Sequence, residues 1–193
     1  MNARTRERCA ERLLSEPGLQ HDEAQTALAA TFSVTAMESP AARLDEASLA
    51  LFGAAGFELR EQARALADVL TNQLCLSPER RDHRALLIDH ALGSRSAHPL
   101  QIAVIGHELG RRAGLSTFVG AYGGQPWTVV CAEARMALVG PASAAGKPSA
   151  AEVRCRCPHQ VAFSVLRAIG RAAPPDAAKR AERLLRSVPV RPC

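Results

Sequence analysis

The chain has 193 residues, of which 47% are hydrophobic and only 4% aromatic, and its formal net charge is +5. This length suits one domain with its own core, and the apolar fraction excludes a disordered chain. Because much of that fraction is alanine, we expect an aliphatic core carried mostly on helices. The basic excess consists of arginines scattered among acids, which disfavours a nucleic-acid-binding protein.

Residues 1–12 lack the apolar stretch of a secretory signal peptide, and no apolar run approaches the ~20 residues of a membrane span. We therefore expect a soluble, cytoplasmic protein that does not bind membranes. In that compartment the six cysteines are expected to be reduced.

Residues 1–78 are predicted to form a helical N-terminal region. Turn formers such as Pro17–Gly18, Gly53 and Gly56 separate its segments of helical periodicity. Four helices are expected: residues 3–15, about ten residues from Asp22, a helix starting at Ser39–Pro40, and residues 58–74.

Residues 79–142 are predicted to form the core of the fold. A short helix over residues 84–92 precedes a central helix that begins at Pro99 and ends before Gly114. Since this helix is apolar almost all round, we expect it to be buried on more than one side. The period then changes to that of strands, which predicts an antiparallel set over residues 117–121, 127–132 and 136–139.

Residues 143–193 are predicted to be a linker and a helical tail. Residues 140–151 are rich in Pro, Ala, Ser and Gly, and helices are expected over residues 161–169 and 176–187. The fold class is therefore α+β: a helical N-terminal layer, a central buried helix packed on a small antiparallel sheet, and a C-terminal helical hairpin. The three regions are expected to form one compact unit.

A series of stretches, in order, resembles the transglutaminase-like superfamily, and its SirB-type branch in particular. Residues 66–70 resemble the helix before the family's core, and residues 94–100 and 108–115 resemble the entry and the exit of its central helix. Residues 124–130 resemble the strand with the catalytic histidine, residues 139–141 the end of the next strand, and residues 177–189 the last helix of the tail. The resemblance covers most of residues 40–190. It implies a transglutaminase- or papain-like core with a helical, tetratricopeptide-like tail.

In active members of that superfamily a cysteine at the helix start is the nucleophile, a histidine on the neighbouring strand activates it, and an acid or amide orients the histidine. The resemblance places Pro99, Gln125 and Gly140 at these positions. None of the three can perform the corresponding step. The resemblance therefore implies a catalytically inactive relative, a binding or regulatory module for protein partners. Its degenerate cleft would be lined by Arg95, His98, Pro99, Gln125, Trp127 and Gly140. We expect Trp127 to be core packing rather than a ligand platform.

Two other functions stay open. One is a cysteine-dependent hydrolase or acyltransferase with a relocated nucleophile, in which Cys131 pairs with His98. Six residues of strand separate Cys131 from Gln125, or about 20 Å, which disfavours this pair. The other is a purely helical scaffold without a cleft function.

No metal or cofactor is expected. Cys155, Cys157 and His159 offer three zinc ligands in five residues, but a closed site needs a fourth. His107–Glu108 begins a zinc-protease pattern, yet Arg111 stands where the second histidine is required. We expect His107 to be an ordinary surface or core residue.

Overall fold

The computed structural model describes residues 3–32, 39–140 and 150–188, and its fold is α+β, as the sequence predicts. The described helices are α1 (Ala3–Leu14), α2 (His21–Phe32), α3 (Pro40–Ser48), α4 (Leu59–Asp68), α5 (Ile88–Ser94), α6 (Pro99–Arg112), α7 (Pro158–Ala172) and α8 (Pro175–Ser187). Short 3₁₀ turns η1 (Leu49–Leu51), η2 (Ala54–Gly56), η4 (His83–Leu86) and η5 (Ala150–Glu152) connect them, and a π-helical turn, η3 (Val69–Gln73), continues α4.

The helix ends follow their local sequence signals. The expected helix over residues 58–74 is α4 plus its π-helical continuation, and Glu58 and Glu61 form a reciprocal capping box at its start. Helix α6 begins with Pro99 in its first turn, and Gly114 follows it with φ +77°, a backbone conformation that suits glycine.

Four strands form the main sheet, in the order β5-β4-β3-β6. They are β3 (Thr117–Tyr122), β4 (Gln125–Ala132), β5 (Arg135–Val139) and β6 (Arg154–Cys155), and every neighbouring pair is antiparallel. The first three confirm the predicted strands. Strand β6 was not predicted, because two residues are too few to show a period.

A second, parallel pair joins β1 (Ser77–Pro78) to β2 (Ser96–Ala97). The sequence did not indicate this pair, because two residues per strand are too few to show a period. The pair ties the segment after β1 to the start of α6, because the amide of Glu79 donates to the carbonyl oxygen of Ala97 at 2.9 Å.

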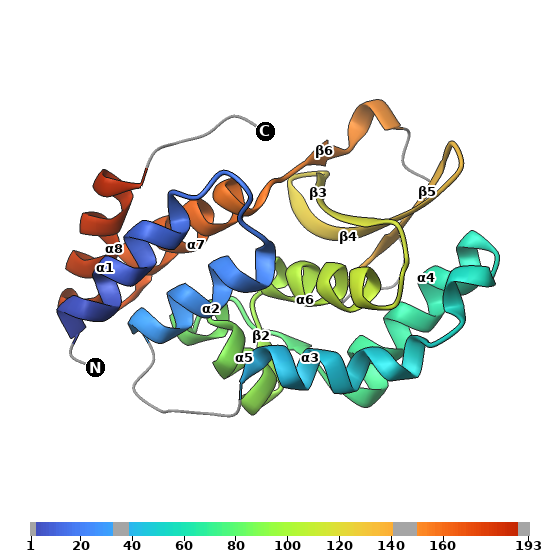
Figure 1. Cartoon of the computed structure of the whole chain (residues 1–193), viewed down its shortest axis with the longest axis horizontal. Coiled ribbons are helices and arrows are strands. Elements are labelled where there is room, and N and C mark those ends of the chain that lie inside the picture. Colours follow the sequence, from blue (N-terminus) through green and yellow to red (C-terminus); the bar gives the residue numbers. More distant parts are fainter. Residues whose placement is uncertain (1–2, 33–38, 141–149, 189–193) are drawn as a thin grey trace.

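Helix α6 lies between the sheet and the helices of the N-terminal region (Figure 1). A Cβ atom added at Gly106 would clash with Oγ1 of Thr128, so glycine permits the close approach of helix and β4. The hydroxyl of Thr128 donates to the carbonyl oxygen of Ala103 at 2.9 Å. The predicted burial of α6 is confirmed, and Val104 and Ile105 are both 0% exposed.

Two apolar clusters share α6. One draws on α1, α2, α7 and α8, and the other on α3, α4, α5 and β4. Helices α7 and α8 form the predicted C-terminal hairpin, and α1 contacts α8 although they lie at opposite ends of the chain (Figure 1). Within the described residues, no helix has the length and hydropathy that crossing a membrane requires. Most of the loop predicted over residues 140–151 lies outside the described part.

Candidate functional site

His98 and Pro99 form the N-terminal end of α6. His98 is the N-cap residue, and its Nδ1 accepts a hydrogen bond from the amide of Leu100 at 3.2 Å. Accepting at Nδ1 requires the tautomer with its proton on Nε2. Burial, and then the positive charge of Arg80, hold the pKa of His98 below its ordinary value. His98, beside the position that the resemblance assigns to a nucleophile, is therefore neutral at neutral pH and serves as a helix cap.

Gln125 begins β4, and its side chain is held by an arginine that the sequence did not single out. Nη2 of Arg80 donates to Oε1 of Gln125 at 2.7 Å. The same guanidinium lowers the pKa of His98, so Arg80 links the strand to the helix start. Arg80 follows β1, and the β1–β2 pairing that positions it left no periodic signal in the sequence.

Trp127 of β4 packs against Gly140, which directly follows β5. Thr128 of β4 pairs with Val139 of β5, which brings the two residues together. A Cβ atom at Gly140 would lie 2.6 Å from the indole, so glycine leaves room for the ring. Trp127 is 9% exposed, and its Nε1 donates to the carbonyl oxygen of Tyr122 at 3.2 Å. The prediction that Trp127 is core packing is confirmed.

Arg95 has a backbone role. It ends α5 with φ 61°, and its carbonyl oxygen accepts from the amide and the hydroxyl of Ser77 at 2.9 Å and 3.1 Å. Its side chain is exposed, and within the described residues no hydrogen bond or ion pair holds its guanidinium.

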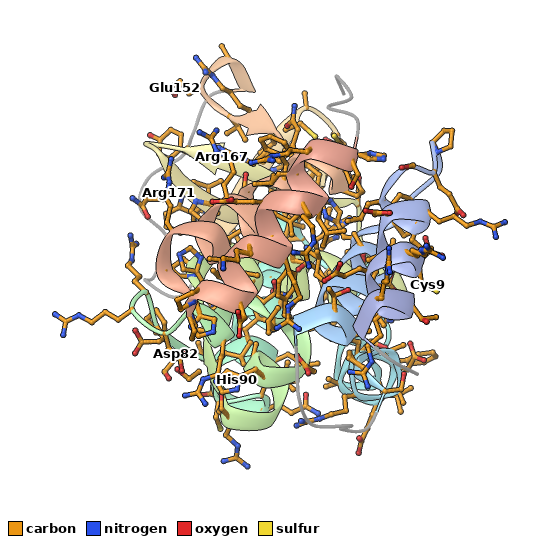
Figure 2. The ribbon with its side chains drawn as sticks, turned by 90° about the vertical axis from the view of Figure 1, so that its left-hand side faces the viewer. Cys9, Asp82, His90, Glu152, Arg167 and Arg171 are labelled. Carbon is orange, nitrogen blue, oxygen red and sulfur yellow. The ribbon has the colours of Figure 1, made fainter. Side chains whose placement is uncertain are left out.

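Asp82 lies at the centre of a cluster of polar side chains close to the start of α6. Its carboxylate pairs with Arg84 at 2.8 Å and lies 3.9 Å from Nε2 of His90. Figure 2 labels Asp82 and His90 next to each other. The hydrogen bond from Arg84 lowers the pKa of Asp82. In the same turn, the carbonyl oxygen of Ala85 accepts from the amide of His98 at 2.8 Å. This group is partly exposed, so its ion pairs add little stability.

Cys131 lies at the far end of α6 from His98. Its amide donates to the carbonyl oxygen of Ser116, which follows the C-terminal end of α6, at 2.8 Å. Burial raises the pKa of its thiol, which lowers the fraction present as the nucleophilic thiolate. Both observations oppose a dyad of Cys131 with His98.

The segment around β6 does not present three free metal ligands. Cys155 is an exposed free thiol, whereas Cys157, the N-cap of α7, is disulfide-bonded. The expectation that all six cysteines are reduced is therefore wrong for Cys157. Among the residues that the structure describes, no three His, Cys, Asp or Glu side chains are placed to hold a metal ion.

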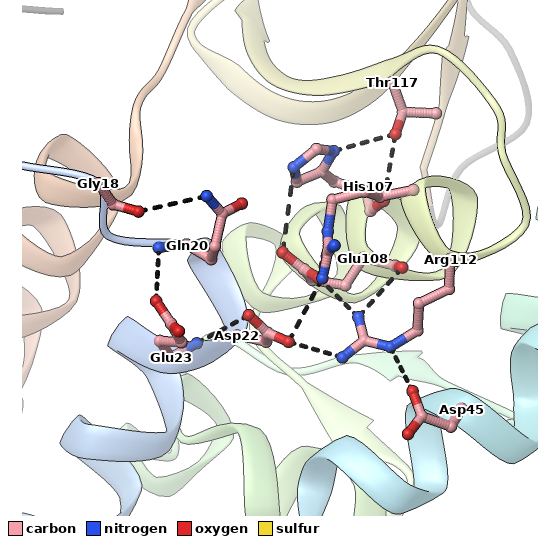
Figure 3. Close-up of polar contacts among 10 residues, drawn as sticks. Gly18, Gln20, Asp22, Glu23, Asp45, His107, Glu108, Arg112 and Thr117 are labelled. Atoms are coloured by element: carbon pink, nitrogen blue, oxygen red, sulfur yellow. Dashed lines mark hydrogen bonds and ion pairs between the residues drawn. The ribbon is translucent and has the colours of Figure 1, made fainter.

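The C-terminal end of α6 carries a buried ionic cluster that sequence reasoning missed (Figure 3). Glu108 is 0% exposed, and its Oε2 lies 2.8 Å from Nη2 of Arg111 and 2.6 Å from Nη1 of Arg112. Arg112 also reaches Asp22 of α2 at 2.6 Å and Asp45 of α3 at 2.7 Å. One guanidinium thus ties three helices together.

Two histidines complete this cluster. The rings of His21 and His107 meet edge to face with centroids 5.0 Å apart, and Nδ1 of His107 lies 3.0 Å from the hydroxyl of Thr117. Burial, followed by the charge of His107, lowers the pKa of His21 to about 3. Burial also lowers the pKa of His107, although Glu108 opposes this shift. Both rings are neutral at neutral pH.

The ion pairs of the cluster have a structural role, because they hold α2, α3 and α6 together. Burial opposes the charge of Arg112, but hydrogen bonds to Asp45, Asp22 and Glu108 outweigh it and raise its pKa. A signal was present in the sequence: Glu108, Arg111 and Arg112 stand at the i, i+3 and i+4 positions of one face of an otherwise apolar helix. The partners on α2 and α3 have no counterpart signal in the sequence.

A scan against protein-family models finds no match to this chain, and a search of curated proteins finds none either. The resemblance to transglutaminase-like proteins consequently rests on the residues of the sequence alone.

Proposed function

We propose that this chain is a catalytically inactive, transglutaminase-like protein of SirB type that acts by binding protein partners. One observation carries the proposal: the positions that correspond to the nucleophile, base and acid all hold structural residues. Pro99 starts a helix, Gln125 accepts from Arg80, and Gly140 packs against Trp127.

The arrangement of these positions supports the superfamily part of the proposal. They come from the start of a buried helix and from two adjacent antiparallel strands that follow it. Strand β4 packs on α6, and Arg80 bridges Gln125 to the surroundings of His98. This is the order of elements that the resemblance implies.

The enzyme alternative is less well supported. Cys131 lies near Ser116, beyond the other end of α6, and its thiol has a raised pKa. The scaffold alternative does not account for a sheet that packs on the central helix. The cytoplasmic location proposed with the function rests on the sequence alone, and the disulfide at Cys157 is unusual for that compartment.

Thiol reactivity tests the absence of catalysis. In the full chain, alkylation with iodoacetamide at pH 7 should proceed at every free cysteine no faster than at an ordinary exposed thiol. The His98→Ala variant should show the same rates. A single cysteine that reacts at least ten times faster, and loses this advantage in His98→Ala, would contradict the inactive assignment.

Rebuilding the dyad tests the superfamily assignment. The thiol introduced by Pro99→Cys should have a pKa lower by about one unit in Pro99→Cys/Gln125→His than in Pro99→Cys alone, because a histidine partner at a helix N-terminus favours the thiolate. The matched control is Pro99→Cys/Gln125→Ala, which removes the same glutamine without adding an imidazole. Equal thiol pKa values in all three variants would rule out the proposed correspondence.

A further inference from the structure

A groove of about 620 Å³ lies between α1 and α8, which run side by side in Figure 1. Its volume is in the range of sites that hold small ligands, but such sites are mostly apolar. Here every lining residue is charged: Arg4, Glu7, Arg8, Glu11, Asp176, Lys179, Arg180 and Arg183. Five cations and three carboxylates give the lining a net charge of +2. A wholly charged lining favours a charged ligand.

Two contacts hold the walls of the groove together and set their register. Glu7 of α1, whose side chain is 15% exposed, pairs with Arg183 of α8 at 2.8 Å. One turn further along both helices, the hydroxyl of Ser187 donates to Oε1 of Glu11 at 3.0 Å. Since both residue numbers rise by four, α1 and α8 run parallel. The same register places Arg4 level with Arg180.

The two carboxylates outside the Glu7–Arg183 pair lie toward the ends of the groove. Asp176 is in the first turn of α8, where a negative charge is favourable, and Glu11 is bonded to Ser187 near the last turn. Between these ends lie the other four cations of the lining, Arg4, Arg8, Lys179 and Arg180. The middle of the groove is therefore positive.

These four cations have no carboxylate partner. Across the part of the chain that the structure describes, no ion pair or hydrogen bond holds the exposed side chains of Arg4, Arg8 and Lys179. The guanidinium of Arg180 lies 5.8 Å from the centroid of the Phe32 ring, and its Nε has no hydrogen-bond partner. Like charges held close together repel, so an anion that enters between them is stabilised.

The spacing of the cations indicates a compact anion. Arg4 and Arg8 are one turn apart on α1, or about 6 Å along the helix axis. A nucleic-acid strand is held by a positive groove that follows several nucleotides, whereas these cations are confined to about one turn of each helix. Guanidinium groups bind phosphate oxygens through paired hydrogen bonds, and a lysine adds a point charge. Two or three linked phosphate groups match both the charge and the extent of the cation cluster.

We propose that the α1–α8 groove binds a small anion with linked phosphate groups, held by Arg4, Arg8, Lys179 and Arg180. The inference goes beyond the proposed function and does not depend on it. Because the ligand contacts the first and the last described helix together, it should also stabilise the folded chain against thermal unfolding.

Isothermal titration calorimetry of the purified full chain with inorganic tripolyphosphate, at low ionic strength, tests this proposal. One site per chain is expected, and orthophosphate should bind at least ten-fold more weakly because it reaches fewer of the cations. Arg4→Gln and Arg8→Gln, both at exposed positions, should each weaken the binding of tripolyphosphate at least five-fold. The matched control, Arg171→Gln, removes the same charge from an exposed position of α7 and should bind as the wild type does.

Asp176→Asn should have the opposite effect, because it removes a carboxylate that repels the ligand. Tripolyphosphate should bind at least two-fold more tightly, a gain that damage to the fold would not produce. The proposal is overturned if the wild type does not bind tripolyphosphate, or if Arg171→Gln weakens binding as much as Arg8→Gln does. A single-stranded oligonucleotide or a polyglutamate peptide that binds more tightly than tripolyphosphate would also overturn it, because the groove would then belong to a larger interface.

Discussion

The two ends of helix α6 hold polar side chains in opposite surroundings. At the N-terminal end, His98 is half-buried, and exposed Arg80 and Gln125 hydrogen-bond to each other. At the C-terminal end, Glu108 is fully buried and shares Arg112 with two other helices. The positions that the family resemblance names lie at the first end, but the denser network of charges lies at the second.

The two ends differ in how much stability is lost when one polar interaction is removed. An exposed hydrogen bond can be replaced by water, so its removal costs little. A buried carboxylate and guanidinium cannot recover their hydration, so removing one leaves the other uncompensated. We infer that the C-terminal end contributes more to stability than the N-terminal end, which agrees with the proposed absence of catalysis at the N-terminal end.

The largest expected effect is at the C-terminal end. Glu108→Ala should lower the free energy of unfolding by about 3 kcal/mol, because it takes a fully buried carboxylate away from Arg112, which is 12% exposed, although Asp22 and Asp45 still pair with that guanidinium. Denaturant unfolding would measure this, with Glu182→Ala on the surface of α8 as a control expected to change it by less than about 0.5 kcal/mol. A loss below about 1 kcal/mol for Glu108→Ala would remove the contrast between the ends.

The second prediction concerns acid. The pKa of His21 is about 3 in the folded chain and 6.5 as its reference value, so below pH 6.5 the unfolded chain takes up a proton that the folded chain does not. Stability attributable to His21 is therefore complete above pH 6.5 and falls as the pH drops toward 3, by about 3 kcal/mol between pH 7 and pH 4. In His21→Gln, the free energy of unfolding should lack this part of its dependence on pH.

Unfolding free energies at several pH values between 7 and 4 would measure the slope, and His83→Gln, at a partly exposed histidine, is the control. If the wild type and His21→Gln lost stability in parallel, the burial of a neutral His21 would not govern the acid response.

The sequence predicted the elements that repeat and failed where contacts join distant segments. The period of α6, the glycine at its end and the alternation of β3, β4 and β5 are local signals, and each element forms where expected. The β1–β2 pair and β6 have two residues per strand, too few to carry a period.

The candidate sites divide in the same way. The start of α6 at Pro99, next to His98, and the core position of Trp127 follow from neighbours in the sequence. The contact of Arg80 with Gln125 spans 45 residues, and that of Arg112 with Asp22 spans 90. Such pairs are defined only once the fold brings the segments together, and a single sequence contains no record of them.

The third prediction separates a structural from a chemical role at the N-terminal end. His98→Ala should cost about 1 kcal/mol, the usual value for a lost N-cap. His98→Asp should restore most of this stability, because aspartate accepts the same amide hydrogen bond and favours a helix N-terminus. Thermal or denaturant unfolding of both variants decides the matter. If His98→Asp were as unstable as His98→Ala, the cap would not be the reason for the histidine.

The smallest expected effect is that of Arg80→Ala. Because Arg80 and Gln125 are both exposed, the substitution should change the free energy of unfolding by no more than about 0.5 kcal/mol. It should nevertheless raise the pKa of His98, since the positive charge of Arg80 adds to burial in disfavouring the imidazolium. A proton NMR titration of the His98 ring would measure the shift, and Arg135→Ala, at an arginine paired with Glu58 and Glu133 instead, should leave the titration unchanged. If the pKa of His98 were unaltered in Arg80→Ala, burial alone would lower it. Arg80 would then not link Gln125 to His98 at the start of α6.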